Sequence, residues 1–221
     1  MSDCQNFYLY SGLKGDINLL YTIYTNLYDM LKDRNYDISK MKMYNTIDEF
    51  KKQFKNVEEP DVSVLKFILS KNDNKDDKIS IFWNDDEKIG IRVLKSNMED
   101  MNKKGVKRGI LIVKYSMSTF AKKSIDEFNQ NQSNMYFETF DYSELMMNIT
   151  KHVLVPKHIV LTEDEVTALK DKYSLKRITQ LPKLHKTDPM TKYFGLMPGN
   201  VVKVVRNNPI GSKYITYRIV I

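Results

Sequence analysis

The apolar residues near the start of the chain recur with helical spacing. Four of them lie three or four residues apart: Leu20, Tyr24, Leu27 and Leu31. This spacing predicts a helix over residues 16–34 with one buried face. Thr46 is followed three residues later by Glu49, a capping-box arrangement that predicts a second helix from residue 47. The apolar face of that helix carries three residues: Ile47, Phe50 and Phe54.

Three short apolar runs follow, at residues 62–69, 79–83 and 89–94. Clusters of Asn and Asp at residues 71–74 and 84–86 separate them, and these residue types favour tight turns. Short turns join antiparallel neighbours, so the pattern predicts three strands in an antiparallel meander.

Two further helices and two further strands are predicted beyond the meander. Ser96 and Glu99 form another capping box, which predicts a helix to about residue 104. The apolar run at residues 109–114 is typical of a buried strand. A helix from about residue 118 has an apolar stripe made of Ala121, Ile125 and Phe128. With one more strand at residues 135–140, the first part of the chain is predicted to be an α/β module.

The C-terminal part of the chain has strong helix boundary signals. Thr162 and Glu165 form a capping box, and the helix that follows carries Val166, Leu169 and Tyr173 on one face. Asp188-Pro189 and Gly195 are the residue types that begin and end a short helix.

A hairpin is predicted at the end of the chain. Pro198-Gly199 suits the centre of a type II turn, which leads into a strand at residues 201–206. Residues 213–220 supply the second strand. This part is therefore predicted to be a small α+β unit.

The positive charge of the chain is concentrated in the C-terminal part. The net charge of the whole chain is +7. Residues 151–221 hold 13 Lys and Arg against 5 Asp and Glu, a net +8, whereas residues 1–150 hold 22 against 23. A basic surface attracts nucleic-acid phosphates and acidic protein surfaces alike, so charge alone leaves both partners open.

Composition also bears on the location of the protein. No run of eighteen apolar residues occurs, which predicts no contact with a membrane. The first residues lack the basic start and apolar core of a secretory signal. The single cysteine, Cys4, has no partner for a disulfide within the chain. An intracellular protein is expected.

One pattern resembles a metal-dependent nuclease. Asp61, followed later by Asp86, Glu87 and Lys88, provides the carboxylates and lysine that such enzymes use to hold Mg²⁺ and activate water. The predicted order of helix, three strands, helix and strand also suits a nuclease core. Asp86, however, lies in an Asn-Asp-Asp turn, where local hydrogen bonding explains an Asp equally well. We therefore predict no catalytic residues and no bound metal.

The remaining candidate chemistry is sparse. The three histidines, His152, His158 and His185, lack Cys or carboxylate neighbours at metal-site spacing and are expected to pack or to form hydrogen bonds. No nucleophile motif and no glycine-rich phosphate loop is present in the sequence. No cofactor is predicted.

The predicted helix start at Ser118 is the candidate DNA contact. Ser118 and Thr119 would offer backbone N–H groups to a phosphate, and Lys122 and Lys123 would add positive charge one turn later. An ordinary capped surface helix is the alternative interpretation.

A series of short motifs in the C-terminal part identifies a family resemblance. They are Asn148-Ile149-Thr150, His152, Leu154-Val155-Pro156-Lys157-His158-Ile159, Gln180-Leu181-Pro182, Asp188-Pro189, Tyr193-Phe194-Gly195, residues 199–206 and Tyr214-Ile215-Thr216-Tyr217-Arg218. In this order they resemble the C-terminal assembly module of the fifth-largest subunit of eukaryotic RNA polymerase II, which polymerases I and III share and which archaea keep as a small polymerase subunit. Lys183 and Lys213 stand where the family usually has Arg, and Lys lacks the planar fork that makes two parallel hydrogen bonds.

The first part of the chain resembles the jaw module of the same subunit. The matching residues are Tyr36, Asp48-Glu49-Phe50-Lys51, Gln53-Phe54, Asp61 and Met117-Ser118-Thr119-Phe120-Ala121-Lys122. The resemblance implies a leader at residues 1–15, a nuclease-like α/β jaw at 16–145 and a small α+β assembly module at 146–221. In the family the segment at Ser118 usually reads Thr-Pro-Ser-Ala and approaches downstream DNA; here Thr119 and Phe120 replace the Pro and the Ser.

The resemblance implies a non-catalytic polymerase subunit, present in one copy per polymerase. Its partners would be the largest subunit, neighbouring small subunits and downstream duplex DNA. Ten motif residues would form the protein interface: His152, Pro156, His158, Pro182, Lys183, Tyr193, Gly195, Arg206, Tyr217 and Arg218. The expected location is the nucleus, or the cytoplasm or virion if a large DNA virus encodes the chain.

Two alternatives from other functional classes stay open. One is a metal-dependent, structure-specific DNA endonuclease, and the other is a free-standing DNA-binding adaptor. Co-purification with polymerase subunits would support the subunit hypothesis and exclude the free-standing adaptor.

Overall fold

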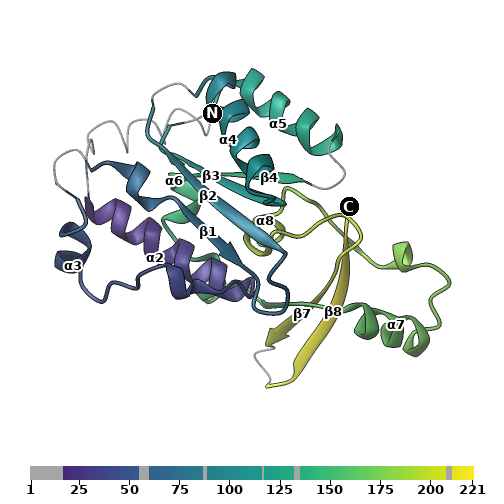
Figure 1. Cartoon of the computed structure of the whole chain (residues 1–221). Helices are drawn as coiled ribbons and strands as arrows, with labels where there is room; N and C mark the ends of the chain where they lie inside the picture. Colours follow the sequence, from purple (N-terminus) through teal and green to yellow (C-terminus); the bar gives the residue numbers. More distant parts are fainter. Residues whose placement is uncertain (1–16, 55–59, 87–88, 116, 132–134, 208–210) are drawn as a thin grey trace. The chain divides into compact units, whose positions relative to one another are not determined.

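The chain divides into two compact units in a computed structural model, residues 1–147 and residues 148–221. The structure describes residues 17–54, 60–86, 89–115, 117–131, 135–207 and 211–221, so the leader at residues 1–15 lies outside the described residues. Each unit has its own four-stranded sheet (Figure 1). The predicted α/β character of the first part and α+β character of the second are confirmed.

The sheet of the first unit has the order β1-β2-β3-β4. Its strands are β1 (Phe67–Ser70), β2 (Lys78–Asn84), β3 (Arg108–Val113) and β4 (Tyr136–Asp141). β1 runs antiparallel to β2, whereas β2, β3 and β4 are parallel. Parallel neighbours require crossover connections, usually helices. α4 (Ile91–Lys103) and α5 (Thr119–Asn131) are those crossovers.

Helices cover both faces of this sheet (Figure 1). α4 and α5 pack on one face, where their apolar residues meet those of the strands in a buried cluster that includes Leu94, Met98, Leu111, Ala121 and Phe137. α2 (Ile17–Asp33) and α6 (Tyr142–Leu145) lie on the other face. The short helix α3 (Ile47–Lys51) packs against α2, and the 3-10 turns η1 (Ile38–Lys40) and η2 (Val62–Leu65) precede β1.

A buried ion pair fixes the end of α2 to the edge strand β4. Arg34 Nη2 lies 2.7 Å from Glu138 Oε2, and the two side chains are only 2% and 8% exposed. Nη1 makes a second bond, 3.3 Å long, to Oε1. The guanidinium carbon also lies 5.9 Å from the centre of the Phe140 ring. Since both charges are out of water, removal of either one would leave the other uncompensated.

Several predicted elements of the first unit are confirmed. α2, β3, α5 and β4 lie within two residues of their predicted bounds. Thr46 caps α3 through a bond from the Glu49 amide. The Glu49 carboxylate instead accepts from the Asn45 amide, so only half of the predicted capping box forms. Residues 62–65 form a 3-10 turn, and the strand predicted there begins only at Phe67.

The third predicted strand, residues 89–94, is wrong. Residues 91–94 belong to α4, which begins after Gly90, and Ser96 therefore lies inside the helix rather than at its start. Leu94, Met98 and Met101 are buried at helical spacing, and the parallel pairing of β2 with β3 requires a crossover here. The predicted antiparallel meander is wrong for the same reason, although the pairing of β1 with β2 is antiparallel.

The sheet of the second unit has the order β5-β7-β8-β6. Its strands are β5 (Lys157–Val160), β6 (Lys183–Leu184), β7 (Val201–Asn207) and β8 (Lys213–Val220). The helices are α7 (Glu163–Lys172) and α8 (Pro189–Phe194), with 3-10 turns η3 (Ile149–Lys151) and η4 (Ile178–Gln180). The small core consists of Leu184, Leu196, Val202, Val204 and Val220, with Phe194 packed against it.

The helix caps and the hairpin of the second unit are confirmed. Thr162 and Glu165 make both bonds of the capping box. Asp188 caps α8, and Gly195 ends it in a left-handed conformation with φ of 60°. The Asn200 amide donates to Met197 O across the predicted turn, and β7 pairs with β8 as predicted. The edge strands β5 and β6 were not predicted.

Gly109 on β3 provides a test of the packing between α4 and the sheet. A Cβ atom at this position would lie 2.5 Å from Met101 Sδ and 2.7 Å from Phe137 Cδ2. We predict that Gly109→Ala lowers the free energy of unfolding by about 1–3 kcal/mol, the usual cost of overpacking a core. Trp83, the only tryptophan, is buried in the first unit, so its fluorescence during urea denaturation follows that unit.

Gly90→Ser is the matched control for this substitution. No atom lies within 4 Å of a Cβ at Gly90, and Ser is a favourable residue before a helix. Equal unfolding midpoints for Gly109→Ala and the unchanged protein would show that α4 does not pack against β3 as described.

Candidate nucleic-acid and partner interfaces

The first turn of α5 holds the four predicted DNA contacts together. Ser118 caps the helix, because its Oγ accepts a bond of 3.2 Å from the Ala121 amide. Ala121 faces the core, which leaves Ser118, Thr119, Lys122 and Lys123 exposed. The oxygen of Ser118 is thus engaged in the cap, and the two lysines carry the charge of this site.

The orientation of α5 on the sheet is fixed by a side chain in its last turns. Asn129 Nδ2 donates to Phe137 O at 3.0 Å, and the Phe137 amide donates to Asn129 Oδ1 at 2.8 Å. Asn129 therefore faces β4. Lys122 lies two turns earlier on the same side of the helix, because residues seven apart nearly coincide around a helix.

An exposed aromatic residue lies among these polar residues. Phe120 is 65% exposed, although a side chain of this size usually contacts other apolar groups. The sequence contained the signal, since Phe120 falls between Thr119 and Ala121 and off the apolar stripe of α5. It was not among the predicted contacts.

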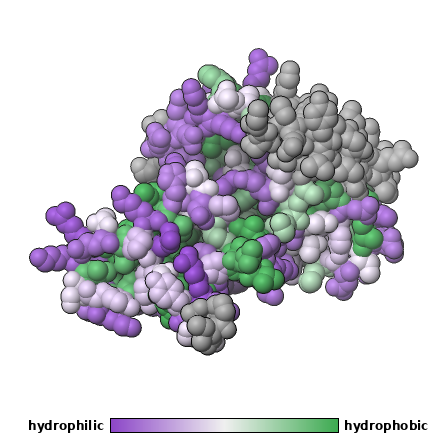
Figure 2. Space-filling model, turned by 180° about the vertical axis from the view of Figure 1, so that it is seen from behind, coloured by the Kyte–Doolittle hydropathy of each residue, from purple (hydrophilic) through white to green (hydrophobic). Residues whose placement is uncertain are grey.

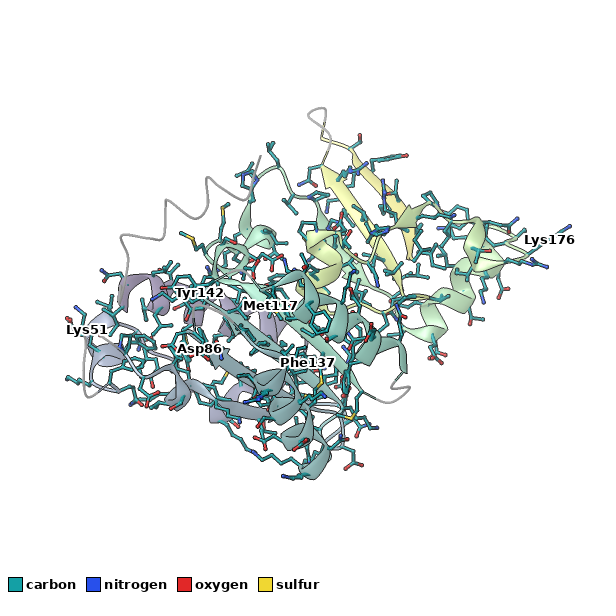
Figure 3. The ribbon with its side chains drawn as sticks, turned by 90° about the horizontal axis from the view of Figure 1, so that it is seen from above. Lys51, Asp86, Met117, Phe137, Tyr142 and Lys176 are labelled. Atoms are coloured by element: carbon teal, nitrogen blue, oxygen red, sulfur yellow. The ribbon has the colours of Figure 1, made fainter. Side chains whose placement is uncertain are left out.

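Asp86, one of the residues of the nuclease-like pattern, lies toward the same end of the sheet. Figure 3 labels Asp86, Met117 and Tyr142, which follow β2, β3 and β4 and lie toward this end. The Asp86 carboxylate accepts a bond of 3.0 Å from Asn84 Nδ2, and the Asp86 amide donates to Asn84 Oδ1. Burial raises the pKa of the Tyr142 phenol well above its usual range, with smaller contributions from Asp85 and Tyr115.

Asp61 has a local structural role. It caps η2, where its Oδ1 accepts from the Ser63 amide at 3.0 Å, and hydrogen bonds from the Ser63 side chain and amide lower the pKa of Asp61. Glu87 and Lys88 lie outside the described residues. Across the part of the chain that the structure describes, no three carboxylates, histidines or cysteines come close enough to hold a metal ion. The geometry adds nothing in favour of a nuclease centre.

Each histidine is engaged locally. His152 Nδ1 accepts from the Leu154 amide at 3.2 Å. His158 Nδ1 lies 2.7 Å from Pro156 O, and His185 Nδ1 lies 2.7 Å from Thr187 Oγ1. These bonds agree with the expected hydrogen-bonding role.

Two of the ten predicted interface residues face inward. Tyr193 is buried beside Phe194, with ring centres 5.2 Å apart, and Gly195 is the buried cap of α8. Both shape the second unit, so they are not available to a partner on its surface.

Three further predicted interface residues hold the edge strand β6 in place. The Ile219 amide donates to Pro182 O at 2.9 Å, and Arg218 Nη1 donates to Lys183 O at 3.3 Å. The Lys183 side chain points into solvent. Its backbone is therefore structural, whereas its charge is available.

The segment at residues 152–160 has the most exposed apolar side chains of the second unit. Val153 and Leu154 are 96% and 85% exposed, and Ile159 and Val160 on β5 are partly exposed. Three predicted interface residues, His152, Pro156 and His158, lie in the same segment. Hydrophobic side chains can be seen on the surface among hydrophilic ones in Figure 2. Such exposed apolar clusters commonly mark protein interfaces.

None of the described helices is both long enough and apolar enough to cross a membrane.

Comparison with known proteins gives matches in both units. Residues 15–101 match the family described as RNA polymerase Rpb5, N-terminal domain, and residues 147–220 match RNA polymerase Rpb5, C-terminal domain. Among individual relatives, the chain is 35% identical over 205 residues to the DNA-directed RNA polymerases I, II, and III subunit RPABC1 of Caenorhabditis elegans, an alignment that covers 91% of this chain and 95% of the relative.

Two further relatives extend the comparison beyond animals. The chain is 35% identical over 204 residues to the corresponding subunit rpabc1 of Dictyostelium discoideum, which covers 92% of this chain and 98% of the relative. It is 31% identical over 210 residues to DNA-directed RNA polymerase subunit 5-like protein 1 of Arabidopsis thaliana, with 94% and 98% covered. The resemblance seen in the sequence motifs is confirmed: the chain belongs to the RNA polymerase Rpb5 family.

Proposed function

We propose that this protein is an accessory subunit of a multisubunit DNA-directed RNA polymerase and has no active site of its own. The observation that carries the proposal is similarity over nine-tenths of the chain to proteins named as shared polymerase subunits. Because the similarity includes both units, the role of the whole relative is transferred rather than that of one domain. The subunit is present once per polymerase and acts in the nucleus.

The second unit, with its net charge of +8 over residues 151–221, anchors the chain to the largest subunit and its small neighbours. Its contact centres on the apolar segment at residues 152–160, and Arg206 adds positive charge on β7, the strand that pairs with β5. Lys183 and Arg218 add charge farther across the sheet, on β6 and β8. An apolar centre with charged surroundings is the usual composition of a protein interface. An acidic partner surface complements this charge.

The first unit is the jaw, and the start of α5 is directed at downstream duplex DNA. Lys122 and Lys123 neutralise phosphates, and the capped helix end holds them in place. Such contacts position DNA without reading its sequence. The polymerisation chemistry belongs to other subunits.

The anchor is tested by Val153→Asp/Leu154→Asp in the full chain. We predict that the variant is lost from purified polymerase, because a carboxylate replaces each apolar contact and cannot be buried against the partner. Quantitative mass spectrometry of polymerase isolated through its largest subunit measures the amount retained. Met43→Asp/Val64→Asp is the matched control, since these residues are 60% and 50% exposed in the first unit.

Full retention of the Val153/Leu154 variant would move the anchor elsewhere on the chain. Absence of the unchanged protein from the polymerase would overturn the subunit proposal itself and favour a free-standing adaptor.

The DNA contact is tested by Lys122→Ala/Lys123→Ala in assembled polymerase. Each phosphate that is no longer neutralised should reduce the slope of log affinity against log salt concentration by roughly 0.9, without a change in sequence preference. Titration of a downstream duplex at several salt concentrations measures the slope. An unchanged slope would return α5 to the role of an ordinary surface helix.

To test whether the protein lacks an active site of its own, the purified chain is incubated with duplex, flap or four-way DNA in the presence of Mg²⁺ or Mn²⁺. We predict no cleavage, because Asp61 and Asp86 serve local hydrogen bonds. Asp61→Asn keeps the capping oxygen of η2 and removes the charge. Metal-dependent cleavage that disappears in Asp61→Asn would show a nuclease.

A further inference from the structure

The second sheet has an outer edge at β5. In the strand order β5-β7-β8-β6, only one side of β5 is paired. The Leu161 amide donates to Val201 O at 3.0 Å, and these two residues continue the register of β5 with β7. Residues of an antiparallel pair alternate between bonding the partner strand and pointing away from it. Ile159 therefore bonds β7, whereas the backbone N–H and C=O groups of His158 and Val160 point outward.

These outward groups are not bonded by any residue that the structure describes. No hydrogen bond within the described ranges reaches the backbone N–H or C=O of His158 or Val160. The His158 ring makes a local bond to Pro156 O, which leaves the strand edge open. An unpaired and exposed backbone edge is a template for another strand.

The outer edges of the first sheet, in contrast, are bonded within the chain. On β4, Asn129 bonds both the N–H and the C=O of Phe137. On β1, the C=O of Ser70 accepts from the Asp37 amide. Proteins commonly cover sheet edges in this way and so prevent unwanted pairing. The open edge of β5 is thus a candidate for pairing with a partner.

Apolar side chains border the outward backbone groups on both faces of the second sheet. Ile159 and Val160 are 36% and 37% exposed, and successive residues of a strand point to opposite faces. Leu154, a few residues earlier, is 85% exposed. A strand added at this edge would therefore cover apolar surface and bond the backbone at the same time.

The charge around β5 differs between its two ends. Lys157 begins the strand, and Lys203 on β7 lies opposite Ile159 on the same face. The strands β5, β7 and β8 contain no acidic residue. Glu163 and Asp164 follow the other end of β5, in the first turn of α7. A segment that is acidic at the Lys157 end and apolar along the rest complements this pattern.

We propose that a strand of the largest polymerase subunit adds to the outer edge of β5, bonds the backbone of His158 and Val160, and becomes a fifth strand of the second sheet. The two-residue spacing of the outward groups fits an extended polypeptide, whereas a helix uses its backbone groups internally. The added segment is acidic where it passes Lys157 and apolar beside Val160. The inference rests on the proposed function, because it specifies how the anchor at residues 152–160 binds.

Val160→Pro tests the inference in assembled polymerase. Proline removes the outward N–H of residue 160 without removing a bond to β7, and edge strands tolerate proline in this orientation. The variant and the unchanged chain are co-expressed at equal levels, and quantitative mass spectrometry of polymerase isolated through its largest subunit gives their ratio. We expect roughly tenfold depletion of the variant, because a buried partner carbonyl loses its donor, a cost of about 1.4 kcal/mol.

Two matched variants control for the substitution itself. Val160→Thr keeps the N–H and the branched side chain. Glu163→Pro places proline at the first position of α7, where the helix needs no backbone donor. Both should assemble as the unchanged chain does.

A second measurement needs no substitution. Residue-resolved hydrogen exchange compares the unchanged chain alone and in polymerase. The amides of His158 and Val160 should exchange at least roughly tenfold more slowly in polymerase, because each amide gains a bond there.

Equal assembly of Val160→Pro and Val160→Thr, or unchanged exchange of the two amides, would overturn strand addition. If Val153→Asp/Leu154→Asp is nevertheless lost from polymerase, the anchor proposal stands and only the added strand is wrong. Retention of that variant as well would overturn the anchor itself. If the amides are slowed in a dimer of the purified chain and not in polymerase, the occupant is a second copy and the inference is wrong.

Discussion

The parallel pairing of β2, β3 and β4 is the constraint on which the first unit depends. A parallel pair cannot be joined by a tight turn, so each connection must cross one face of the sheet. Such crossovers are right-handed, which puts α4 and α5 on the same face and aligns their first turns at the carboxyl ends of the strands. Open α/β sheets commonly bind their ligands at this end. The position of Lys122 and Lys123 thus follows from strand direction as much as from the local sequence of α5.

Packing on the two faces holds this arrangement rigid by different means. The face under α4 and α5 is apolar, and Gly109 allows Met101 and Phe137 to approach the backbone of β3 closely. The opposite face includes the buried pair of Arg34 and Glu138, which joins α2 to β4. A buried ion pair of this kind adds little to the net free energy of folding. It disfavours other arrangements, because any arrangement that separates the two charges leaves each of them buried without a partner. The packing on both faces of the sheet therefore fixes the positions of the first turns of α4 and α5.

Local signals in the sequence were sufficient for elements whose ends are set by side-chain caps. Thr162 and Glu165 form the hydrogen bonds of a capping box at the start of α7. Gly195 adopts the left-handed backbone conformation that ends α8. The first turn of α5 was predicted for the same reason, through Ser118. α4 was missed because Gly90 provides no side-chain cap and because Ile89, Ile91 and Val93 alternate as in a strand.

The sequence did not predict the features that depend on strand pairing between distant parts of the chain. β5 has little buried surface of its own and is a strand because it pairs with β7. The direction of β2 relative to β3 likewise depends on a pairing across 29 positions, from Ile79 to Arg108. The most direct test of the central claim is the structure of the polymerase that contains this chain, determined by electron cryo-microscopy with a downstream duplex bound. We expect the second unit to contact the largest subunit through residues 152–160 and the start of α5 to face the DNA backbone. A chain seated in the polymerase with this end of the sheet turned away from the duplex would contradict it.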